Sequence, residues 1–147
     1  MEFLPVGQAS TLPRWVEPSV VTEHEGQWRL HGTRCRDCDS RFFPRAYSCA
    51  TCMGTAVEDH VISPEGELHV SALARATQPG FHAPARYGWV NIPADGVRVF
   101  AHIVPADGPD PEAGVPVVFD PVIVGADDDG PFCSIAFRVL DRTSQEG

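Results

Sequence analysis

Four of the five cysteines in this chain form two close pairs, and this spacing constrains the fold more than any other feature of the sequence. The pairs are Cys35-Arg-Asp-Cys38 and Cys49-Ala-Thr-Cys52, separated by ten residues. Thiolates at this spacing reach one ion from a single tight turn, and two such turns supply the four sulfurs, at about 2.3 Å each, that tetrahedral Zn²⁺ accepts. The sequence therefore predicts a zinc site with the ligands Cys35, Cys38, Cys49 and Cys52.

The short spacer between the pairs predicts a compact ribbon of two knuckles joined by one hairpin. Because four sulfurs leave no coordination position for water, the metal is expected to hold the fold and to perform no hydrolysis. Two disulfides are the alternative. The amino terminus, Met-Glu-Phe-Leu-Pro, lacks the basic and apolar regions of a secretion signal, which favours the metal site over disulfides.

Length and composition leave room for this small module and one further domain. The 147 residues are 43% hydrophobic and 21% charged, values typical of globular proteins. The 13 glycines and 14 prolines favour many turns and short strands over a helical bundle. Since no apolar run approaches the ~20 residues that span a bilayer, we expect a cytoplasmic protein that does not interact with membranes.

The formal net charge of −9 opposes binding to a nucleic-acid backbone. The positive charge is uneven, however, and a local basic face near the cysteines could still meet a phosphate or an acidic partner surface. The arginines in question are Arg29, Arg34, Arg36, Arg41 and Arg45.

Beyond residue 60 the sequence predicts strands. Residues 66–77 alternate through Leu68, Val70, Ala72 and Ala74, and further strands are expected at 87–92, 97–104, 117–124 and 131–140. Five strands, with a long proline-rich link between the third and the fourth, match the OB-fold barrel, with a five-stranded sandwich as the alternative.

We therefore expect a mostly β protein in three parts. Residues 1–60 form the N-terminal lead-in and zinc ribbon, 61–142 the OB-fold barrel, and 143–147 a tail. The sequence from Ser19 to Gly26 offers an N-cap and a stop, and so predicts a short N-terminal helix or turn.

Several motifs together resemble the DUF35 family of zinc-ribbon and OB-fold proteins over roughly residues 19–140. They are Trp28 and Leu30 before the cysteines, Arg41-Phe42-Phe43-Pro44-Arg45 between the pairs, Gly66-Glu67-Leu68, Arg86-Tyr87, and Gly114-Val115-Pro116-Val117-Val118-Phe119. One departure is visible, because the family tends to show a Pro-Tyr pair where this chain has Arg86-Tyr87.

The resemblance implies a rubredoxin-like zinc ribbon followed by an OB-fold, in a non-catalytic accessory subunit. Its partner would be a thiolase-fold enzyme of acyl-CoA metabolism, such as a thiolase, a side-chain aldolase or a C-acyltransferase. In such a hetero-oligomer the partner carries the catalytic residues. The accessory subunit helps to shape the substrate and CoA entrance at the shared interface.

The residues themselves agree that this chain carries no catalytic site of its own. Cys133 is the one cysteine outside the pairs, and its apolar neighbours predict a buried, unreactive thiol. The six histidines occur singly, without metal-ligand spacing. His82 has the best claim to touch a ligand, so Phe81, His82 and Arg86 are the candidates for binding CoA or the acyl group.

Exposed aromatics rimmed by arginine are typical of protein interfaces. We therefore predict that the ribbon hairpin from Arg41 to Arg45, together with residues 81–87, docks on the partner. The alternative function is a nucleic-acid-binding ribbon with an OB-fold, which the few arginines among many acids in residues 61–142 oppose. A free-standing zinc-buffering protein is a third reading, and the barrel beside the ribbon argues against it.

Overall fold

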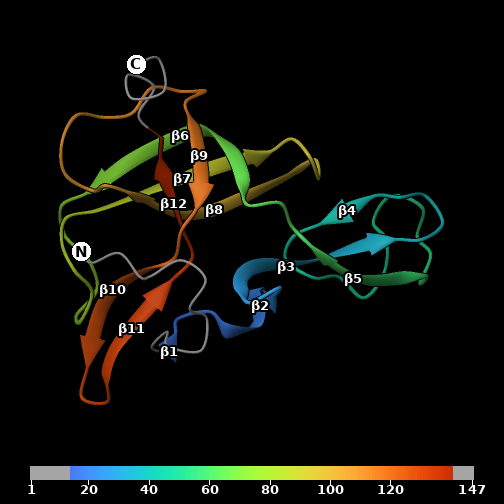
Figure 1. Cartoon of the computed structure of the whole chain (residues 1–147), viewed down its shortest axis with the longest axis horizontal. Helices are drawn as coiled ribbons and strands as arrows, with labels where there is room; N and C mark the ends of the chain where they lie inside the picture. Colours follow the sequence, from blue (N-terminus) through green and yellow to red (C-terminus); the bar gives the residue numbers. More distant parts are fainter. Residues whose placement is uncertain (1–13, 141–147) are drawn as a thin grey trace.

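The computed structural model describes residues 14–140, and the regular structure in this range is almost entirely β (Figure 1). The mostly β fold expected from the sequence is confirmed. The strands are β1 Arg14–Trp15, β2 Val21–His24, β3 Gln27–Cys35, β4 Arg41–Phe42, β5 Val57–Val61, β6 Glu65–Ala74, β7 Ala85–Ile92, β8 Val97–Val104, β9 Pro116–Phe119, β10 Val122–Asp127, β11 Gly130–Ser134 and β12 Ala136–Val139.

The N-terminal ribbon is built on the long strand β3. Its first half pairs with β2, and its second half pairs with β4 on one side and β5 on the other. The β2–β3 hairpin turns at Glu25 and Gly26, which both have positive φ, 53° and 80°. This is the backbone conformation that a tight two-residue hairpin requires. Because β3 ends at Cys35, the same strand also places the first cysteine.

The short helix expected between Ser19 and Gly26 is reduced to three residues of 3-10 helix, Pro18–Val20. The residues that follow form β2 instead. Val21 pairs with Leu30 of β3, and both side chains are buried in the main core. Burial of this pair on a sheet outweighs the local helix signal, because β-branched residues such as Val21 and Thr22 favour strands.

The second part is a closed five-stranded barrel with the strand order β12-β8-β7-β6-β9. Strands β6, β7 and β8 are consecutive and antiparallel, β12 lies parallel to β8, and β9 closes the ring between β12 and β6. This is the Greek-key arrangement expected of an OB-fold, which confirms the barrel over the sandwich. The barrel interior is filled by Leu68, Val90, Val99, Ile103, Phe137 and their neighbours.

A β-bulge in β6 alters the prediction for the first barrel strand. The register against β7 shifts between Leu68 and Val70, so one extra residue is inserted there. A one-residue shift turns every following side chain to the other face of the sheet. Leu68 is therefore 1% exposed inside the barrel, whereas Val70 is 51% exposed on its outside.

Each of the last two expected strands is divided in the structure. The segment 117–124 becomes β9 and β10, and the segment 131–140 becomes β11 and β12. Pro121 lies at the first break and has no N–H for a continued ladder. Strands β10 and β11 leave the barrel as a hairpin and form a separate three-stranded sheet with β1 (Figure 1). A small second core lies beneath it, made by Val104, Val122, Val124, Phe132 and Ala136.

The ribbon is joined to the barrel by a polar junction around Asp95, in the turn between β7 and β8. Its carboxylate accepts hydrogen bonds from the backbone N–H of Ser63 at 2.7 Å and pairs with His60 Nε2 at 2.6 Å. Arg41 donates to the carbonyl of the neighbouring Ala94 at 2.9 Å.

The boundary that we place at residue 60 lies within β5, and the expected tail lies outside the described residues. Within residues 14–140 no helix is long and apolar enough to cross a membrane.

Candidate metal centre

The two cysteine pairs sit in knuckles with the same backbone design. In each, the N–H of the residue after the second cysteine donates to the carbonyl of the first cysteine, at 2.8 Å. These following residues, Asp39 and Met53, both adopt the left-handed conformation, with φ of 63° and 65°. The N–H of the first cysteine in turn donates across the knuckle to a carbonyl five residues later, again at 2.8 Å in both. The repeated turn presents both thiols of each pair to the same point.

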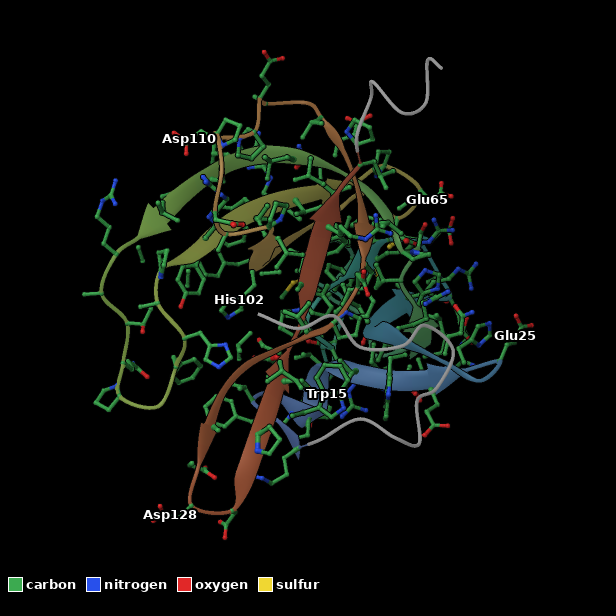
Figure 2. All side chains as sticks on the ribbon, turned by 60° about the vertical axis from the view of Figure 1, so that its left-hand side comes forward. Trp15, Glu25, Glu65, His102, Asp110 and Asp128 are labelled. Carbon is green, nitrogen blue, oxygen red and sulfur yellow. The ribbon has the colours of Figure 1, made fainter. Side chains whose placement is uncertain are left out.

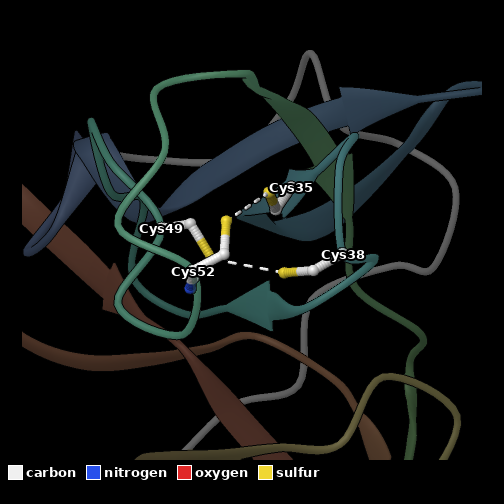
Figure 3. A group of neighbouring side chains, drawn as sticks. All are labelled: Cys35, Cys38, Cys49 and Cys52. Carbon is white, nitrogen blue, oxygen red and sulfur yellow. Dashed lines mark hydrogen bonds between the residues drawn. The ribbon is translucent and has the colours of Figure 1, made fainter.

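The four sulfur atoms gather into one cluster, and they all lie within 4.8 Å of one another (Figure 3). Cys35 Sγ is 3.7 Å from Cys52 Sγ, and Cys38 Sγ is 3.5 Å from Cys49 Sγ. Disulfide sulfurs lie about 2.05 Å apart, and the four thiols are free. Four sulfurs bonded at about 2.3 Å to one tetrahedral ion lie roughly 3.8 Å apart. The cluster therefore has the dimensions of a metal cage.

The four thiols of the cluster can all be ionised only if a cation is bound between them. The backbone N–H of Cys52, 3.4 Å from Cys49 Sγ, helps to lower the pKa of the Cys49 thiol to about 6. The backbone N–H of Gly54 also favours a thiolate at Cys52, but hydrogen bonding with the sulfurs of Cys49 and Cys35 outweighs it and raises that pKa to about 12. Thiolates this close repel one another, so all four ionise together only around a positive ion.

The arginines near the cysteines are largely engaged by acids of the same module. Arg34 pairs with Asp39 of the first knuckle and donates from Nη1 to Glu58 Oε1 of β5 at 2.7 Å. Arg41 Nη2 lies 3.6 Å from Asp39 Oδ2, and Arg45 Nη1 lies 3.9 Å from Asp59 Oδ1. These pairs fasten the knuckles to the ribbon sheet and reduce the positive charge available to a phosphate ligand.

Phe81 and His82, two of the candidates for ligand binding, lie on the loop between β6 and β7. This loop is anchored to β10, because His82 N donates to Val124 O at 2.8 Å. The ring of Phe81 packs edge-on against Phe132 at 4.9 Å between centroids, so Phe81 is half-buried. His82 is exposed and lines a cavity of about 280 Å³ with Pro84, Val104 and residues 105–107.

Arg86, the third candidate, does not line that cavity and is only 1% exposed. Its Nη1 donates to Asp110 Oδ1 at 2.7 Å, and its Nη2 donates to the carbonyl of Ala106 at 3.4 Å. Figure 2 shows Asp110 on the loop above the barrel, well away from the β10–β11 hairpin tip at Asp128. Arg86 therefore ties the loop 105–115 to the barrel. The sequence could not reveal this, because a partner 24 residues away is set by the loop's path.

The expected docking hairpin is less exposed than its aromatic sequence suggests. Phe42 is half-buried, and Phe43 packs against the main core.

Cys133 is fully buried, as expected, and burial, together with the charge of Glu17, raises its pKa to about 12. The sequence analysis missed His102, which is buried beside Tyr87 with a ring separation of 4.6 Å. On the outside of the barrel a row of apolar side chains is exposed; the sequence pointed to Trp89 as an exposed aromatic but not to Val70 or Phe100.

Comparison with known proteins bears on the ribbon and on the whole fold. Residues 26–58 match the family described as "ChsH2, rubredoxin-like zinc ribbon domain". The chain is similar to a solved structure named "Ltp2-ChsH2(DUF35) aldolase", with a TM-score of 0.62 and 23% identity, over 76% of this chain and 84% of that one. It is also similar to a DUF35-family protein of unknown function from Sulfolobus solfataricus, with a TM-score of 0.51 and 13% identity, over 76% of each chain. No curated protein matches the sequence.

Proposed function

We propose that this chain is a zinc-binding accessory subunit of a thiolase-fold acyl-CoA enzyme. The proposal builds on the resemblance to the DUF35 family, which the ribbon match confirms and the shared fold supports. The observation that carries the proposal is the similarity to ChsH2(DUF35), a protein whose solved structure is named as part of an aldolase with Ltp2. The reaction of the complex would be that of a thiolase, a side-chain aldolase or a C-acyltransferase.

The metal in this proposal is zinc, held by Cys35, Cys38, Cys49 and Cys52. Four thiolates at tetrahedral spacing form the soft donor set that Zn²⁺ accepts, and the matching family is described as a zinc ribbon. With four sulfurs bound, zinc would supply structural stability and no site for a reacting water. The two knuckles hold the hairpin between the pairs in one shape, which positions β4 against the barrel.

The chemistry of the complex would belong to the partner. In this chain Cys133 is a poor nucleophile, because its buried thiol has a pKa raised to about 12. Its replacement by serine should therefore leave the activity of the complex nearly unchanged at equal folded fraction. A functional metal-thiolate site also requires reduced cysteines, which fits the expected cytoplasmic location.

For acyl-CoA we propose a place beside the loop from Phe81 to Pro84, at the shared interface. The exposed His82 and the cavity of about 280 Å³ support this position. Arg86 would contribute indirectly, because it holds the loop 105–115 that forms the other wall of that cavity. The nucleic-acid alternative gains no support from the ribbon, where Arg34, Arg41 and Arg45 are paired with acids.

The test is co-expression of the full chain with the thiolase-fold enzyme encoded nearest to it in its own genome. We expect the two to co-purify as a stoichiometric complex that contains zinc and turns over an acyl-CoA substrate, whereas the isolated chain does not. Turnover by the isolated chain, or failure of the two proteins to associate at micromolar concentrations, would contradict the proposal.

A further inference from the structure

One face of the barrel carries a row of exposed apolar side chains that the fold leaves uncovered. In the described residues the exposed large hydrophobics are Val16, Tyr47, Met53, Val70, Trp89 and Phe100. Three of them lie side by side on neighbouring strands, because Val70 pairs with Trp89 and Trp89 pairs with Phe100. Single exposed apolar residues are normal on protein surfaces, but a row in register across three strands forms a patch.

The bulge in β6 is what completes this row. It turns Val70 and Ala72 outward, beside Trp89 and Tyr87 of β7. Just beyond the bulge, where Gly88 pairs with Ser71, a Cβ at Gly88 would meet the Val70 carbonyl oxygen at 2.6 Å, so the close approach of the two strands there requires glycine. By turning Val70 and Ala72 outward, the bulge gives up the stabilisation that burying these apolar side chains would provide. Bulges are often found at functional sites, where they direct side chains toward a ligand or partner.

The aromatic rings of this face hold one another in place. Trp89 and Phe100 lie 5.1 Å apart at 58°, and Tyr87 stacks on Phe100 at 6.0 Å with 3° between the planes. Tyr87 also contacts the buried ring of His102 at 4.6 Å. Rings that are already ordered lose little entropy on binding, which makes them effective anchors in an interface. We name the set Val70, Ala72, Tyr87, Trp89 and Phe100 the aromatic face.

On one side, the aromatic face is bordered by a polar row that is balanced in charge. The next register row is formed by Glu67, Asn91 and Arg98, and Arg98 Nε donates to Asn91 Oδ1 at 2.7 Å. An apolar centre with a polar rim is the anatomy of a protein–protein interface. A polyanion would require excess cations here, whereas the row bordering the face offers one arginine and one glutamate in a chain of net charge −9.

The size of the face also bears on its occupant. From strand and residue spacings, the two rows of the aromatic face on three strands cover roughly 200 Å². A stable homodimer needs about 800 Å² per partner, and the net charge of −9 repels a second copy. We propose that the aromatic face is the central anchor of a larger interface with the partner enzyme, which presents an apolar patch and a carboxylate for Arg98. This inference rests on the proposed function and replaces the ribbon hairpin as the main docking element.

The experiment is titration calorimetry of the zinc-loaded full chain with the thiolase-fold enzyme encoded nearest to it. Trp89→Ala and Phe100→Ala should each weaken binding about thirtyfold, which corresponds to the loss of a hot-spot residue. Tyr47→Ala is the matched control, because Tyr47 is an aromatic residue of the ribbon that is 95% exposed, and it should bind as wild type does. Val70→Asp places a charge in the face without touching the core and should also abolish tight binding.

Zinc content and melting temperature verify that each variant is folded. Equal binding by wild type, Trp89→Ala and Val70→Asp would overturn the aromatic face and leave the proposed function intact. No binding by wild type would overturn the proposed function and this inference with it. Two further outcomes overturn the choice of occupant: Trp89-dependent binding of a single-stranded oligothymidine, or a homodimer in sedimentation experiments that Phe100→Ala dissociates.

Discussion

At the scale of single residues, burial decides the chemistry of the barrel's histidine. His102 is 6% exposed, its Nδ1 is buried without a hydrogen-bond partner, and burial lowers its pKa to about 4. The unfolded chain, with a pKa near 6.5, therefore binds more protons than the folded chain between these two values. Folding stability is accordingly full above about pH 6.5 and falls as the pH drops toward 4.

The expected size of this effect is about 3 kcal/mol across that window, since each unit of pKa difference corresponds to about 1.4 kcal/mol. The measurement is urea unfolding at several pH values, for wild type and for His102→Phe. Because other acids also titrate in this range, the difference between the two proteins isolates His102. His82→Phe, a change at an exposed loop position, is the control and should keep the wild-type slope. Parallel pH profiles for wild type and His102→Phe would contradict this account.

At the scale of elements, the loop 105–115 depends on one buried guanidinium. Replacing Asp110 by alanine removes the carboxylate that pairs with the buried Arg86 and leaves it the Ala106 carbonyl at 3.4 Å, and should destabilise the fold by about 1–3 kcal/mol. In an Arg86→Met background the same change should cost almost nothing, because no buried charge remains. Hydrogen exchange of residues 105–115 and a double-mutant cycle measure both effects. Equal costs in the two backgrounds would show that the pair does not hold the loop.

The junction between ribbon and barrel makes a second prediction at this scale. The Asp95 side chain is 6% exposed, and its carboxylate accepts hydrogen bonds from His60 Nε2 and from the Ser63 N–H. Asp95→Ala leaves these donors unpaired and should cost about 2 kcal/mol, while the proposed zinc should remain bound because none of the four cysteines is touched. Chemical denaturation and metal analysis of one preparation test both statements. Asp128→Ala, in the exposed hairpin tip, is the control (Figure 2).

At the scale of the whole molecule, the ribbon and the barrel share one core. Val21, Leu30 and Ile62 of the N-terminal part and its connection belong to the same hydrophobic cluster as the barrel interior. Removing the proposed zinc ion should therefore lower the melting temperature of the barrel as well as unfold the ribbon, because metal binding and folding of a small module are one event. Calorimetry before and after chelation, with Cys49→Ser as the genetic equivalent, tests this. A barrel transition that stays at its original temperature would mean that the two parts are energetically independent.

The sequence by itself determined the features that depend on local spacing. Each C-x2-C turn places its two sulfurs side by side, the short spacer lets the two turns meet, and alternating apolar residues specify strands. Turn residues and a proline-rich link were also sufficient to indicate a five-stranded barrel. Within this range the predictions and the structure agree.

The tertiary structure decided what depends on partners distant in the sequence. The bulge at Leu68–Val70 arises from pairing with β7, and it alone separates a buried leucine from an exposed valine two residues later. Arg86 was expected at a ligand entrance, yet the fold buries it against Asp110. A single register shift or a loop's path costs little locally, so no short sequence pattern encodes it. These long-range pairings nevertheless choose which side chains remain on the surface, and therefore where this protein can bind.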